Sequence, residues 1–142
     1  MRLRRIGWFC GALLLVSGCA TSTLSSGLFS LPANAVSVDW AVVNDSPSPQ
    51  TVRVTVYKIG IGVGPKSPVA PGSLTVTVSP NEATHNANSV GATKPFVPGF
   101  YYEVVVEASD PNVLPTVHIW QDLGNTVIPG TRIGPTDFKR LH

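Results

Sequence analysis

Few residues in this 142-residue chain have the types and spacing that catalysis or metal binding requires. The three histidines, His85, His118 and His142, lie in separate segments, and no two have the spacing of metal ligands. Asp39 and Asp122 could form a carboxylate pair, but their separation in the sequence gives no reason to expect one. The sequence contains no Gly-x-Ser-x-Gly elbow and no His-Glu-x-x-His motif. Because a metal site needs several converging donors, we expect no metal and no cofactor. Because no catalytic motif occurs, we also expect no enzymatic activity.

Both cysteines lie near the amino terminus. Cys10 falls within an apolar run from Ile6 to Val16, and Cys19 follows shortly after that run. Three arginines precede the run, at positions 2, 4 and 5. A basic start followed by roughly ten apolar residues is typical of a secretion signal, because the run is too short to cross a bilayer comfortably. We therefore expect the chain to be exported.

The leader ends in Val16, Ser17, Gly18 and Cys19. These residues resemble the lipobox of bacterial lipoproteins, which is an aliphatic residue, a small residue, Gly or Ala, and then Cys, and they match all four positions. The resemblance implies removal of the signal peptide, residues 1–18, and a diacylglycerol group on the Cys19 sulfur. A further acyl chain such as palmitate would then be added to the new amino terminus. The alternative is an ordinary cleaved signal peptide with an incidental cysteine.

The resemblance also implies a location at the cell envelope. In a Gram-negative cell, Ala20 directly after the cysteine is similar to the residues that direct lipoproteins to the outer membrane. In a Gram-positive cell the anchor would lie in the outer face of the cell membrane. A chain with several hydrocarbon tails stays attached stably, whereas a single tail gives only marginal binding.

Removal of the leader changes the composition of the chain. The mature chain has 124 residues, enough for one domain with a hydrophobic core. Seven basic residues then face eight acidic ones, so the net side-chain charge is −1 and nothing suggests a nucleic-acid partner. No thiol remains for a disulfide, because Cys10 leaves and Cys19 carries lipid. Residues 19–27 are small and polar, which predicts a lipidated tether before a single domain over 28–142.

Alternating apolar and polar residues predict β-strands throughout this domain. The clearest alternation occurs in five runs: 36–42, 51–57, 74–78, 102–108 and 116–120. A weaker strand is expected over 82–90, and short strands near 126–128 and 132–133. Three prolines within 60–72 predict a loop or an irregular edge there. Since no run has a helical period, we expect an all-β antiparallel sandwich.

Two segments resemble fibronectin type III and related immunoglobulin-like domains. Val38-Asp39-Trp40 is similar to their second strand, in which an aliphatic residue and a Trp point inward together. The Pro-Gly turn before Tyr102 resembles the corner that precedes their sixth strand. The resemblance implies an immunoglobulin-like sandwich of about seven strands, with the Tyr102 hydroxyl bonded to backbone upstream as a tyrosine corner. It covers residues 36–108 and carries no activity, and the region after Asp110 departs from the pattern.

In such a sheet, three of the expected strands are neighbours: 51–59, 102–108 and 116–121. Their outward positions include the four residues of a candidate interaction face: Tyr57, Val105, His118 and Trp120. An exposed Trp on a partly apolar face is typical of a recognition surface. The alternative is that the tail after Leu123 folds back and covers this face.

The sequence therefore predicts a lipid-anchored, extracytoplasmic β-sandwich with a binding or structural role at the cell envelope. Its expected partners are the membrane, through Cys19, and a protein or other envelope component. The alternative function is an accessory module that presents a ligand to an envelope enzyme or secretion complex.

Overall fold

The computed structural model describes residues 21–60, 62, 64–122 and 126–141. The predicted signal peptide and the lipid acceptor Cys19 lie outside these residues. Within the described ranges, no helix is long and apolar enough to cross a membrane.

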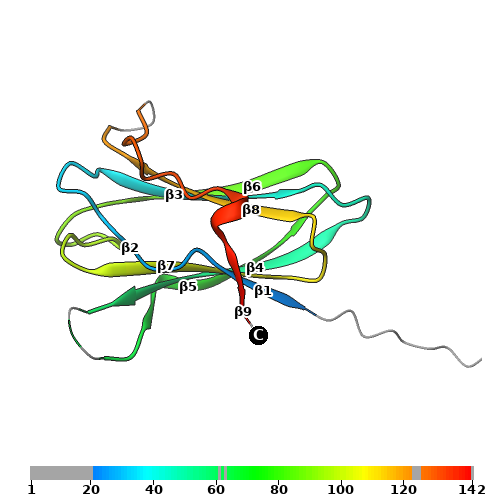
Figure 1. Cartoon of the computed structure of the whole chain (residues 1–142), viewed down its shortest axis with the longest axis horizontal. Helices are drawn as coiled ribbons and strands as arrows, with labels where there is room; N and C mark the ends of the chain where they lie inside the picture. Colours follow the sequence, from blue (N-terminus) through cyan, green and yellow to red (C-terminus); the bar gives the residue numbers. More distant parts are fainter. Residues whose placement is uncertain (1–20, 61, 63, 123–125, 142) are drawn as a thin grey trace, which may run out of the picture.

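The described residues form two antiparallel sheets that lie face to face, with the larger sheet below the smaller one in Figure 1. The larger sheet contains, in spatial order, β5 (Ser67–Val78), β4 (Gln50–Ile59), β7 (Tyr101–Ala108), β1 (Ser22–Ser25) and β9 (Lys139–Leu141), with β2 (Phe29–Ser30) also beside β7. The smaller sheet contains β6 (Glu82–Ser89), β3 (Ser37–Asn44) and β8 (Val113–Trp120). The prediction of an all-β antiparallel sandwich is confirmed.

Alternation along the strands places apolar residues between the sheets. Every second residue of β3 and β7 points inward, and these positions carry Val38, Trp40, Tyr102 and Val104. The expected inward position of Trp40 is confirmed, because its exposed fraction is 3%, and the Tyr102 of the expected corner is 0% exposed. Both strands are flanked on each side by other strands, so their inward side chains lie near the centre of the sandwich.

The tyrosine corner is also present. The Tyr102 hydroxyl donates a hydrogen bond to the Val97 carbonyl oxygen at 2.8 Å and accepts one from the Val97 N–H at 2.6 Å. The Tyr102 ring packs against Phe96, with ring centroids 4.8 Å apart. These contacts attach the loop before β7 to the core.

The expected order of strands is wrong at one point. β8 does not lie beside β7 in the larger sheet, because all eight of its residues pair with β3 in the smaller sheet. The place beside β7 is taken by β1, whose residues Ser22–Ser25 were expected in the flexible tether. Three of these four residues are small and polar, and Leu24 packs against the core; the strand is held by the ladder and by side-chain bonds such as Ser22 Oγ to the Ala108 carbonyl at 3.2 Å. The tether prediction is therefore wrong for residues 22–25.

The segment from Ser67 is part of a strand rather than a loop. β5 starts seven residues earlier than the alternation indicated, and it includes Pro68 and Pro71. The prediction that this region lies at an edge is confirmed, because β5 pairs only with β4 among the described strands. Prolines are tolerated there because an edge strand needs only half of its N–H groups for pairing.

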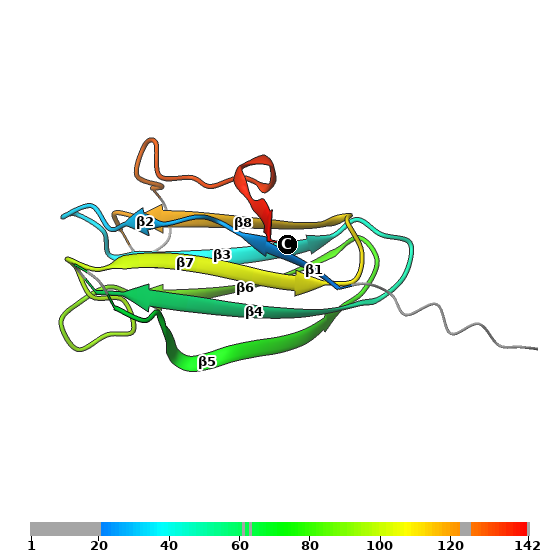
Figure 2. The same cartoon turned by 60° about the horizontal axis from the view of Figure 1, so that its bottom comes forward.

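The carboxy-terminal tail joins the two sheets along one side of the sandwich. After β8 it forms two isolated bridges, Trp120 with Val127 and Val117 with Ile133, at the two positions where short strands were expected. It then passes through the 3-10 turn η1 (Pro135–Asp137) and ends as β9, which pairs with β1 in the other sheet. Figure 2 shows this crossing in red. Phe138, between η1 and β9, is buried in the core along this path.

Candidate functional site

The four residues predicted to form one interaction face lie on two different sheets. Tyr57 and Val105 are on the outer side of the larger sheet, whereas His118 and Trp120 are on the outer side of the smaller one. The predicted single face is therefore wrong, and the reason is that β8 pairs with β3 instead of β7.

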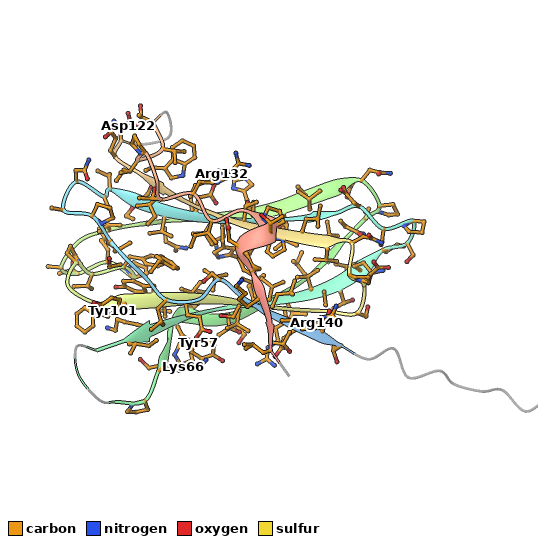
Figure 3. The ribbon with its side chains drawn as sticks, viewed as in Figure 1. Tyr57, Lys66, Tyr101, Asp122, Arg132 and Arg140 are labelled. Carbon is orange, nitrogen blue, oxygen red and sulfur yellow. The ribbon has the colours of Figure 1, made fainter. Side chains whose placement is uncertain are left out.

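The part of the face on the larger sheet is covered by the protein itself. Val105 is only 7% exposed. The Lys66 ammonium lies 4.7 Å from the centre of the Tyr57 ring and 2.8 Å from Glu103 Oε2. Figure 3 shows Tyr57 and Lys66 close together on this side of the sandwich. Side chains of β4, β7 and the segment before β5 thus close this surface.

Glu103 is the ionised centre of this closed surface. Besides Lys66, its carboxylate accepts a hydrogen bond from the Ser25 hydroxyl at 2.5 Å. Burial by itself raises the pKa of Glu103, but the hydrogen bonds from Lys66 and Ser25 and the charge of Lys66 outweigh it, so the pKa is lowered. This cluster links β1, β7 and the start of β5, and we interpret it as structural.

The outer side of the smaller sheet is open and carries a groove of about 370 Å³. Its seven lining residues come from all three strands of the sheet: Ser37, Asp39, His85, Ala87, Asn88, Ser89 and Trp120. Two rows of paired residues cross it. One row is Trp120, Ser37 and Ser89, and the other is His118, Asp39 and Ala87. The β3 and β6 residues of these rows have mostly small side chains. Trp120 therefore forms one wall of a hollow instead of packing against another large side chain.

Among the residues that the structure describes, none from the tail lines this groove. It lies along the free side of β8, where Val127 pairs with Trp120. Ile128 and Phe138, two apolar residues of the tail, are buried in the core. Trp120 is partly buried by this neighbour and by His118, whose ring centre is 5.9 Å away, and it still lines the groove.

Asp39 is the charged group of the groove. Its Oδ1 is buried and, among the described residues, has no hydrogen-bond partner; the nearest ionisable atom is His85 Nδ1 at 3.7 Å. Burial raises the pKa of the Asp39 carboxyl, and the nearby His85 and His118 only partly offset this. A desolvated carboxylate beside an open hollow would be stabilised by a ligand that donates a hydrogen bond or carries positive charge.

The pKa of His118, the second histidine of this cluster, is lowered. Burial lowers the pKa of His118, the nearby Arg132 lowers it further, and Asp39 opposes the change. Arg132 lies on the tail above the smaller sheet (Figure 3). In the described part of the chain, no three His, Cys, Asp or Glu side chains are grouped closely enough to hold a metal ion.

The sequence predicted Trp120 and His118 as residues of an interaction face. It did not predict that Asp39 and His85 lie beside them. Asp39 was considered only with Asp122, which instead accepts a hydrogen bond from the Thr126 N–H at 2.9 Å. The missing information was the register of β6 and β8 on either side of β3. His142 lies outside the described residues.

No protein family, curated protein or solved structure matches this chain. Its function can therefore be inferred only from its residues and their arrangement.

Proposed function

We propose that this protein is a lipid-anchored binding module of the bacterial cell envelope, with no catalytic role. The observation that supports binding is the groove on the smaller sheet, where a partly exposed Trp120 and a desolvated Asp39 face the same open hollow. An aromatic ring beside a carboxylate gives a partner both apolar contact area and a directional polar contact.

The anchor is supported by the basic and apolar leader and by the lipobox-like residues that end at Cys19. β1 begins at Ser22, only three residues later, and three extended residues span at most about 11 Å. The first strand would therefore hold one end of the sandwich close to the bilayer.

The groove lies toward the opposite end of the sandwich from this anchored end. Ser22 pairs with Ala108 at the end of β7, and the short connection after Ala108 leads to Val113, which pairs with Asn44 at the end of β3. Ser37 lies at the other end of the eight-residue β3, about 25 Å from Asn44, and it pairs with Trp120 of β8. Both Ser37 and Trp120 line the groove. An anchor at Cys19 would thus leave the groove accessible to a partner, which supports the proposed role.

We also propose that the sandwich is a variant of the immunoglobulin-like arrangement. The tyrosine corner at Tyr102 and the inward Val38 and Trp40 support it. The pairing of β8 with β3 is the departure from that arrangement.

Two measurements test the proposal separately. The variant Cys19→Ser should lose metabolic labelling with a fatty-acid analogue, and retained labelling would contradict the anchor. A photo-reactive amino acid in place of His85, which is 72% exposed beside the groove, should crosslink a partner in intact cells. The control is the same amino acid at Thr75, an exposed position on the other sheet. Equal crosslinking from both positions would contradict binding at the groove.

A further inference from the structure

The strand β6 has an unpaired edge that lacks the usual protection against pairing. Among the described strands it pairs only with β3, so alternate residues direct their N–H and C=O groups to the unpaired side. Its eight residues include no proline, lysine or arginine. The outer edges of the other long strands differ, because β5 contains Pro68 and Pro71 and β8 is flanked by the tail.

The groove described above opens toward this edge. In the row that contains Asp39, the β6 residue is Ala87, and in the row that contains Trp120, it is Ser89. Both side chains are small and exposed, so neither separates the hollow from the free edge. A strand added beside β6 would lie two strand spacings, about 10 Å, from β3, within reach of a long side chain.

A second, smaller hollow lies on the inner side of the same strand. It has a volume of about 20 Å³ and is lined by residues including Trp40, Leu74, Asn86 and Phe96. Asn86 and Asn88 occupy inward positions opposite Trp40 and Val38, where a central strand of a core would carry apolar residues. Leu74 is 37% exposed at this place. This narrow hollow lies between β5 and β6, the edge strands of the two sheets on the side opposite the tail.

We propose that β6 accepts an extended peptide segment of a partner protein as an additional strand of the smaller sheet. This inference rests on the proposed binding function and names its partner. In an extended peptide, successive side chains point to opposite faces. One set would enter the outer groove beside Trp120 and Asp39, and the other would cover Leu74 and the inner hollow. Backbone pairing would supply affinity and the two hollows specificity.

The charges around the groove indicate the chemistry of the outward side chains. The three strands of the smaller sheet contain Asp39 and Glu82 but no lysine or arginine, and Arg132 near His118 lies on the tail along β8, on the far side of the sheet from β6. A basic side chain that crosses Ala87 would meet the Asp39 carboxylate and the face of Trp120, which attract a cation by charge and by cation–π interaction. The inward side chains would be small and apolar, because the inner hollow is narrow and borders the core.

Fluorescence polarisation with full-length protein in detergent tests this inference. The probe is a labelled heptapeptide of alternating valine and arginine, in which either register places the two residue types on opposite faces. The controls are a valine–glutamate peptide and a valine–arginine peptide with an N-methyl group on every residue, which leaves no N–H group on either edge to form a ladder. We expect each control to bind at least about tenfold more weakly than the probe.

Two variants locate the binding site. Ala87→Arg places a cation between the edge and Asp39, and it should weaken probe binding at least about tenfold. Thr75→Arg, at another exposed strand position but on the larger sheet, should leave binding unchanged. Equal binding of the N-methylated peptide, or an Ala87→Arg variant that binds normally, would overturn the inference.

The result also separates this inference from the proposed function. Absence of probe binding, together with a cellular partner that still crosslinks at His85, would overturn strand addition and leave the groove as a binding site. A dimer of the full-length protein that Ala87→Arg dissociates would overturn it in favour of a second copy at this edge.

Discussion

The Tyr102 hydroxyl bonds to both the N–H and the carbonyl oxygen of Val97, and its ring has no exposed surface. These bonds satisfy two backbone groups at the entry to β7, the strand that pairs with β4, β1 and β2. Tyr102→Phe keeps the ring and removes both bonds. We expect the free energy of unfolding to fall by about 1–3 kcal/mol, the cost of leaving partners unsatisfied in a buried site.

Urea unfolding followed by tryptophan fluorescence measures this change. The matched control is Tyr101→Phe, since Tyr101 is 46% exposed and the neighbouring position in the same strand. The control should stay within about 0.5 kcal/mol of the wild type. Equal effects of the two variants would show that the corner contributes nothing.

Trp40 is the largest inward side chain of β3, and it contacts both the core and the inner hollow beside β6. Trp40→Ala should lower the free energy of unfolding by about 3–5 kcal/mol, because the cavity cannot be filled by its neighbours. A loss below about 1 kcal/mol in the same unfolding assay would be inconsistent with this position in the core.

Phe138 anchors the tail where it passes from the smaller to the larger sheet. Phe138→Ala should cost about 3–5 kcal/mol and accelerate hydrogen exchange in β1 and β9, which pair with each other. Leu141→Ala serves as the control, because Leu141 is exposed in β9. If exchange in β1 is unchanged in Phe138→Ala, the tail does not hold the two sheets together.

Glu103 makes the stability of the fold depend on pH. Its pKa is lowered in the folded chain, so its contribution is present above the ordinary glutamate pKa and is lost as the pH falls through the folded-state value. Glu103→Gln should lower the free energy of unfolding by about 1 kcal/mol at pH 7, a modest value because Lys66 is half exposed. The difference should shrink in acid, and a constant difference from pH 7 to pH 3 would refute this linkage.

The local pattern of the sequence predicted most strands and two core residues, because alternation and the Pro-Gly corner before Tyr102 depend only on near neighbours. It could not predict which strands pair. The alternation in β8 would suit either sheet, and the Ser-Thr composition of β1 is equally compatible with a tether. The groove was missed for the same reason, since Asp39, His85 and Trp120 meet only through the register of three strands that are distant in the sequence.

Substitutions at Asp39 and Trp120 allow binding at the groove to be tested without unfolding the protein. Asp39→Asn removes a charge whose burial is unfavourable, so the fold should be no less stable. Trp120→Ala should cost less than Trp40→Ala, because Trp120 is only partly buried at the outer surface.

The most direct measurement is crosslinking from position 85 in intact cells, repeated in the Asp39→Asn and Trp120→Ala backgrounds, with the free energy of unfolding of each variant determined in parallel. We expect both substitutions to reduce crosslinking to the partner greatly while the protein remains folded and abundant. Undiminished crosslinking in both variants would contradict a binding role for the groove.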